Sequence, residues 1–284
     1  MKTKLIITSA LCLAFSVFAF NTLWAELPQW LSPAGLQSHG VFHWGVLGLC
    51  TLWLWLKRAD ILPWVQEARF SPPFIIAGTA IVALSIFLTG FNNLFVFPVL
   101  MGWLGFFAIF FGRGAIIPSA LLAIYGFSLV FPIVMVEWFG EPSVVPVSKT
   151  VSVITSVLGL PVEFEGAVIH YTSLNGDVIS RIITPDCAGY QTIGVFIALF
   201  SLMMLDIRLP LKKAWWVFLL GLTGTWLQNI IRVVVSVAAG YYWGSSAIET
   251  MHANIPYVIF PLWYALFAFV YLLQAGWRRA PGAK

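Results

Sequence analysis

Three residues in the last hundred positions of the 284-residue chain carry side chains that could perform chemistry together: Cys187, Arg232 and His252. A thiolate attacks a carbonyl carbon, and histidine is the one of these three types that shuttles a proton near neutral pH. Arginine stays protonated, so it is no base, but it stabilises a thiolate, an oxyanion or a substrate carboxylate. The three types together could support nucleophilic attack on a carbonyl.

Arg232 stands out because the stretch 215–243 is otherwise apolar, glycine or uncharged polar. A guanidinium near the centre of a membrane-spanning helix costs about 2.5–3.5 kcal/mol on insertion scales, so it normally faces a protein interior or a wet cavity. It is either functional or a structural lock between helices. Asn229 lies on the same helical face, three residues earlier, and could hold the guanidinium or donate to an oxyanion. The alternative for Asn229 is a hydrogen bond between helices.

Cys187 follows Thr184, Pro185 and Asp186 at the start of an apolar stretch. Threonine suits the N-cap of a helix and proline its first position, which predicts Cys187 in the first helical turn. A thiolate is stabilised there and is nucleophilic. Asp186 opposes the thiolate unless it caps the helix or pairs with Arg232. The alternative is that Cys187 is a small buried apolar residue.

The composition indicates a membrane protein. Hydrophobic residues make up 60% of the chain and charged residues 9%, against about 25% charged in soluble domains. The net charge of +4 is too diluted to indicate nucleic acid binding. Three cysteines without a CxxC pair argue against a disulfide scaffold or structural zinc, and we expect no metal or organic cofactor. Cys12 and Cys50, inside apolar stretches, suit the role of small buried residues.

The apolar windows predict an all-α integral membrane protein with about eight transmembrane helices. A bilayer core needs about 20 mostly apolar residues per helix. The first window could be a cleaved secretory signal ending at Ala25, but Leu23 is a poor residue for such a site, so we assign it as a helix. The windows are 5–24, 41–56, 73–90, 95–111, 115–136, 187–205, 215–240 and 256–275.

The basic residues predict the orientation in the cell membrane. Twelve Lys and Arg residues fall in loops on one side, and only Lys149 and Arg181 fall on the other. The positive-inside rule places both termini in the cytoplasm and the start of the sixth span at the extracytoplasmic face. The twelve are Lys2, Lys4, Lys57, Arg58, Arg69, Arg113, Arg208, Lys212, Lys213, Arg278, Arg279 and Lys284.

Residues 138–186 predict a small extracytoplasmic unit. Val147, Val151, Ile154 and Leu158 recur at helical spacing, which is typical of an amphipathic helix on the outer leaflet. Residues 162–183 alternate around two glycine turns and predict a β-meander. The unit is either a connector that caps the bundle or a platform that receives a partner. The chain thus divides into N-terminal helices (1–137), this unit (138–186) and the helices with the chemical residues (187–284).

The rise per residue of a helix predicts that the three candidate catalytic residues lie at one depth in the membrane. Counted at about 1.5 Å per residue from the cytoplasmic ends of their spans, Cys187, Arg232 and His252 lie about 26–33 Å away. The hydrocarbon core is about 30 Å thick, so all three reach its outer boundary. We expect a thiol, a guanidinium and an imidazole to converge at the extracytoplasmic face.

The local sequences around these residues resemble the exosortase/archaeosortase family. The resemblance lies in Asp186-Cys187-Ala188-Gly189-Tyr190 at the start of a span, Asn229-Ile230-Ile231-Arg232 in the next, and His252 before the last. By motif it covers chiefly 184–275. Many relatives have Ser in place of Ala188 and a Gly soon after the histidine, where this chain has Ile255-Pro256.

The resemblance implies a membrane cysteine protease and transpeptidase that acts at the outer face of the membrane. Its substrates would be membrane-anchored proteins with a C-terminal sorting signal: a short motif, a transmembrane helix and a basic tail. By the resemblance, Cys187 is the nucleophile, Arg232 the catalytic arginine and His252 the third member. A lipid or an amine would accept the acyl group, with water as the alternative.

Two other classes of protein stay open. A transporter or channel would also use an arginine inside the membrane, but it would line several spans with polar residues, and the first five spans are nearly free of interior charge. A non-catalytic membrane assembly protein would dock partners on residues 138–186 and tolerate replacement of Cys187. Another kind of membrane acyltransferase is the nearest enzymatic alternative.

Overall fold

The computed structural model describes residues 2–30, 32, 41–66, 70–88 and 96–276. The chain divides into two compact units, Met1–Val130 and Phe131–Lys284. This division follows packing within each unit and does not test the predicted functional division into 1–137, 138–186 and 187–284.

The first unit is helical and held together by small residues. Gly78 in α6 and Gly105 in α7 face each other so closely that a Cβ on Gly78 would lie 2.6 Å from the Gly105 carbonyl oxygen. Small residues let membrane helices approach in this way. Trp103 donates from Nε1 to the Ser16 hydroxyl at 2.7 Å, joining α7 to α1. The helices are α1 (Lys2–Ala19), α2 (Asn21–Trp30), α4 (Val41–Leu56), α5 (Arg58–Gln66), α6 (Pro72–Phe87), α7 (Phe97–Phe111), η4 (Gly112–Ala115) and the start of α8 (Ile116–Val157).

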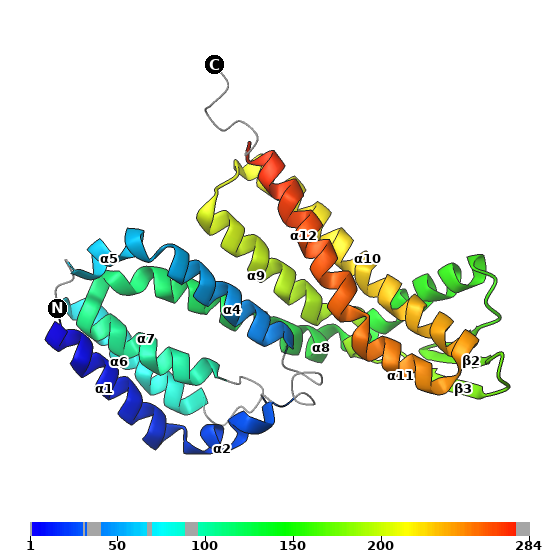
Figure 1. Cartoon of the computed structure of the whole chain (residues 1–284), viewed down its shortest axis with the longest axis horizontal. Helices are drawn as coiled ribbons and strands as arrows, with labels where there is room; N and C mark the ends of the chain where they lie inside the picture. Colours follow the sequence, from blue (N-terminus) through cyan, green and yellow to red (C-terminus); the bar gives the residue numbers. More distant parts are fainter. Residues whose placement is uncertain (1, 31, 33–40, 67–69, 89–95, 277–284) are drawn as a thin grey trace. The chain divides into compact units, whose positions relative to one another are not determined.

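In the second unit, α9, α10 and α12 run side by side (Figure 1). Phe196, Phe267 and Tyr271 are fully buried between them, and Gly221 of α10 gives the Phe196 and Phe267 rings room to pack. Besides the end of α8, the unit contains β1 (Glu163–Glu165), β2 (Val168–Thr172), β3 (Val178–Ile182), η5 (Pro185–Ala188), α9 (Tyr190–Asp206), α10 (Leu211–Trp243), α11 (Ser245–Asn254) and α12 (Pro256–Gln274).

The stretch predicted as a separate amphipathic helix is helical up to Val157, but the prediction that it is a separate element is wrong. One helix of 42 residues, α8, runs unbroken from the predicted fifth span to Val157, through three prolines. Prolines inside membrane helices are tolerated because neighbouring groups satisfy the freed backbone. Val147 and Val151 pack in a core with Ile169 and Ile179 of the sheet, so this apolar face of α8 is covered by protein.

The predicted β-meander is confirmed. The strands form an antiparallel sheet in the order β1-β2-β3. Gly166 and Gly176 have φ of 63° and 89° in the two turns, which favours glycine there. The sheet packs on α10 through Tyr171, whose hydroxyl donates to the Val237 carbonyl at 3.3 Å. Burial raises the pKa of Tyr171 to about 12, against an opposing effect of Arg181, so this donor keeps its proton.

Three helical stretches among the described residues are long and apolar enough to cross a membrane: Phe97–Val157, Leu211–Trp243 and Ser245–Gln274. The first of them contains α7, η4 and α8. Four shorter apolar helices accompany them. The count of eight spans stays a prediction. Of the predicted cytoplasmic cations, Arg69, Arg278, Arg279 and Lys284 lie outside the described residues.

Candidate active site

Cys187 lies in the 3-10 turn η5 ahead of the apolar helix α9, not in the first turn of that helix as predicted. Thr184 is the N-cap of η5, and the Cys187 amide donates to the Thr184 carbonyl at 2.9 Å. The Thr184 hydroxyl lies 3.7 Å from the Cys187 sulfur. Gly189 then adopts the left-handed conformation, with φ of 86°, and α9 begins at Tyr190. Gly189 thus separates η5, which carries Cys187, from α9.

Asn229 attaches this turn to α10. Its side chain is fully buried, and Nδ2 donates to the Cys187 carbonyl at 2.6 Å. A Cβ on Gly189 would lie 2.8 Å from Asn229 Cγ, so glycine is required there by contact as well as by φ. Of the roles predicted for Asn229, the structure contains the hydrogen bond between two segments of the chain, here α10 and η5. Its Oδ1 is buried without a partner among the described residues.

The structure brings Cys187, Arg232 and His252 into one group, here called the Cys187 cluster. The Arg232 guanidinium, in α10, lies within electrostatic range of both Cys187 and Asp186. His252 in turn lies within electrostatic range of Arg232. Arg232 is half-buried, and its Nε is buried without a hydrogen-bond partner in the described part of the chain. Arg232 is thus the member of the cluster that interacts electrostatically with both Cys187 and His252.

The chain reverses direction between α10 and α11, which brings His252 close to Arg232. Gly244, with φ of 86°, ends α10, and α11 packs back along it. Arg232 precedes this reversal by about 18 Å of helix and His252 follows it by about 12 Å, a difference that a long arginine side chain can span. His252 lies in the last turn of α11 and is exposed. It is the member of the Cys187 cluster most open to the surroundings.

Residues of β3 and of the turn before it contact α11. The Ser245 amide, at the start of α11, donates to Asp177 Oδ2 at 3.4 Å. Arg181 on β3 forms an ion pair with Glu249 on α11 at 2.8 Å (Figure 1 shows both elements). The contacts of Asp177, Arg181 and Glu249 were not predicted from the sequence, because the two partners in each contact lie 68 positions apart in the chain.

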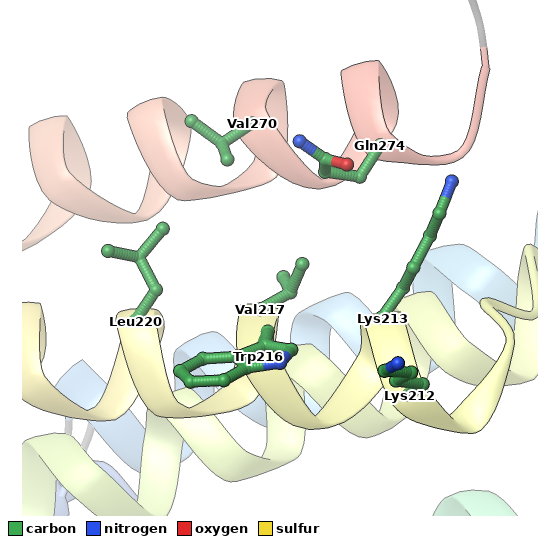
Figure 2. Close-up of a pocket in the computed structure, with 7 residues that line it drawn as sticks. All are labelled: Lys212, Lys213, Trp216, Val217, Leu220, Val270 and Gln274. Atoms are coloured by element: carbon green, nitrogen blue, oxygen red, sulfur yellow. The ribbon is translucent and has the colours of Figure 1, made fainter.

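The described residues contain no group of three or more His, Cys, Asp and Glu side chains that could hold a metal ion. A cavity between α10 and α12 is lined by Lys212, Leu220 and Val270 among others (Figure 2). Lys212 and Arg232 are separated by about 30 Å of helix, so this cavity is not part of the Cys187 cluster. The side chains of the Cys187 cluster offer a thiol, an imidazole and a guanidinium.

Comparison with known proteins shows the family of the chain. No curated protein and no solved structure matches the chain. The family model for the transmembrane exosortases matches residues 7–269, which includes both units and the whole Cys187 cluster. The match covers nearly the full length, so the chain belongs to the transmembrane exosortase family.

Proposed function

We propose that the protein is a membrane-embedded cysteine protease and transpeptidase. It processes membrane-anchored proteins that carry a C-terminal sorting signal, consisting of a motif, a transmembrane helix and a basic tail. The observation that carries this proposal is the Cys187 cluster: a thiol, a guanidinium and an imidazole on three segments far apart in sequence, in a chain of the exosortase family.

In the first half-reaction, His252 takes the thiol proton and Cys187 Sγ attacks the scissile carbonyl carbon. The carbonyl oxygen gains negative charge, which Arg232 stabilises as a fixed positive group. The C–N bond then breaks, His252 returns the proton to the leaving amine, and an acyl-enzyme remains on Cys187. In the second half-reaction an amine, a polar lipid or water attacks the thioester, His252 accepts its proton, and the thiol is regenerated.

Asp186 and Asn229 act as positioning residues in this scheme. Asn229 holds the backbone of Cys187 through the 2.6 Å hydrogen bond. Asp186 lies within electrostatic range of Arg232 and restricts where the guanidinium points. A catalytic geometry depends on such supporting contacts, because small displacements of reacting groups cost large factors in rate.

The site works at the extracytoplasmic face of the cell membrane, with both termini in the cytoplasm. This orientation rests on the distribution of basic residues, twelve on one side against two on the other.

Covalent trapping tests the function. The purified protein is incubated with a peptide that ends in a membrane helix, and the intact mass is measured after rapid acid quench. We expect an acyl adduct on Cys187 that is absent in Cys187→Ala and present in Cys12→Ala. Processing of a membrane-anchored reporter by Cys187→Ala at the normal rate would show that Cys187 is not the nucleophile and would overturn the proposal. Absence of both the adduct and the processing in the wild type would favour a transporter, channel or assembly protein.

A further inference from the structure

A cavity of about 380 Å³ lies between the start of α10 and the end of α12. Its polar groups are gathered at one end: Figure 2 shows Lys213 and Gln274 there, with Lys212 beside them. Leu220 and Val270 line the opposite end. Among the described residues that line it, two carry positive charge and none is acidic.

The position of the cavity along the candidate membrane spans explains why its polar groups lie at one end and its apolar groups at the other. Lys212 and Lys213 stand at the beginning of the candidate membrane span Leu211–Trp243, and Trp216 follows one turn deeper. Lysines at a helix end and tryptophan just inside it mark a membrane–water interface. Leu220 is 52% exposed, so the apolar end is open to the hydrocarbon region rather than sealed inside the bundle.

We propose that this cavity binds an anionic glycerophospholipid. The phosphate lies between the two lysine ammonium groups, Gln274 donates from its amide, and an acyl chain lies along Leu220 and Val270. Basic pockets between membrane helices suit anionic lipid head groups. The bound lipid holds the start of α10 against the end of α12, at the opposite leaflet from the Cys187 cluster.

Native mass spectrometry of the purified protein tests this site with equimolar phosphatidylglycerol and phosphatidylcholine of the same acyl chains. We expect preferential retention of phosphatidylglycerol. Each lysine contributes about a 5-fold preference, so the Lys212→Gln/Lys213→Gln double variant loses roughly 25-fold. Lys149→Gln, an exposed lysine on α8, is the matched control and keeps the preference. Leu220→Trp fills the apolar end and lowers retention of both lipids without changing charge.

Three outcomes contradict the proposal. Equal retention of the two lipids would show that charge does not select the occupant. Unchanged preference in the double lysine variant, when that variant elutes as the wild type does in size exclusion, would place the lipid elsewhere. Displacement of the lipid by inorganic phosphate at millimolar concentration would identify a simple anion site.

A second inference concerns the edge of β3 that faces away from β2 and pairs with no other strand among the described residues. This inference rests on the proposed function. The Ser173 amide bonds the Asp177 carbonyl and the Ile183 amide bonds the Ala167 carbonyl, on either side of the β2–β3 ladder. Antiparallel bonds alternate, so in the register Tyr171↔Ile179 the backbone groups of Val178, Ser180 and Ile182 point away from β2. Val178 and Ile182 are 86% and 67% exposed.

We infer that the extended segment of the substrate adds to this edge as a strand. Backbone hydrogen bonds along an exposed edge are a common way to hold a peptide. β3 leads through Thr184 directly to Cys187, so a segment seated on it is delivered to the thiol. A substrate whose outer domain precedes its membrane helix runs in the same direction as β3 and α9, and the added strand is therefore parallel.

The variant Ser180→Pro tests the role of the β3 edge without changing a residue of the Cys187 cluster. Proline removes the Ser180 N–H, which points away from β2, and leaves the β2–β3 ladder intact. We expect at least a 10-fold loss of reporter processing, unchanged labelling of Cys187 by a small thiol reagent, and full activity of Ser180→Ala. Normal processing by Ser180→Pro would exclude strand addition. Processing by Cys187→Ala would instead reject the proposed function, so the two failures are distinct.

Discussion

The side-chain Nδ2 of Asn229 lies 2.6 Å from the carbonyl oxygen of Cys187 and donates a hydrogen bond to it. Asn229 is fully buried in α10, so this bond joins a membrane helix to the turn that carries the thiol. The same side chain occupies the space where a Cβ on residue 189 would stand. One amide thus holds the backbone of Cys187 and adds a contact to the positive φ that already favours glycine at position 189.

Asn229→Ala should therefore lower both stability and activity. The Cys187 carbonyl loses its donor, and an unsatisfied buried polar group costs about 1–3 kcal/mol in free energy of unfolding. Displacement of the thiol should reduce reporter processing by about 10-fold or more, since each 1.4 kcal/mol of barrier is a factor of ten. Gln228→Ala, the preceding position of α10, is the control. Wild-type processing in Asn229→Ala would show that this bond does not position Cys187.

A comparison of Gly189→Ala with Gly159→Ala distinguishes the effect of the Asn229 contact from the effect of a positive φ alone. Both Gly189 and Gly159 have positive φ, of 86° and 72°, so alanine costs about 1–2 kcal/mol at either position. Only at Gly189 would the new methyl group meet Asn229; around Gly159 nothing lies within 4 Å. We expect Gly189→Ala to abolish most processing and Gly159→Ala to lower only the melting temperature. Equal effects of the two variants on processing would contradict the role of the Asn229 contact.

The parts of the fold that follow from local sequence were predictable. The meander follows from alternating residues and two glycine turns, each within a few positions of the strands it joins. The boundary of α8 was not predictable, because a proline in sequence carries a strong expectation of a helix end. In the structure Pro142 and Pro146 lie within α8, where the core around Val147 and Val151 packs on one face of the helix.

The candidate site shows the same division. The residue types and spacing of Cys187, Arg232 and His252 drew attention to them, and helical rise put them at one depth. The break at Gly189 and the partner of Asn229 depend on how α10 is rotated against η5, which no local pattern encodes. The contacts of Asp177 with Ser245 and of Arg181 with Glu249 each join positions 68 residues apart, and neither has a local signal.

Thiol labelling tests the proposed orientation. A reagent that cannot cross membranes, added to intact cells, should modify Cys187 alone. Cys187 is partly buried in a turn outside α9, whereas Cys12 and Cys50 lie within the apolar helices α1 and α4. The masses of the peptides after tryptic digestion identify the modified residue. Modification of Cys187 only after permeabilisation would place the site on the cytoplasmic side.

Arg232→Lys tests whether the guanidinium acts through its shape or only through its charge. Lysine keeps the positive charge but offers a single ammonium in place of a planar group with five N–H donors. Arg232 lies within electrostatic range of Cys187, Asp186 and His252, and a planar group with several donors can bond more of these neighbours at once than one ammonium can. We expect reporter processing to fall by 100-fold or more, on the order of the loss of one oxyanion donor.

The control for that variant is Arg181→Lys. Arg181 pairs with Glu249 at an exposed position, where ion pairs contribute about 0–1 kcal/mol and lysine can replace arginine. Processing should stay within about 3-fold of the wild type, which corresponds to less than 1 kcal/mol. Comparable abundance of both variants in the membrane, measured by immunoblot, shows that folding is not the cause of any loss. Full activity of Arg232→Lys would reduce Arg232 to a structural lock between α10 and its neighbours.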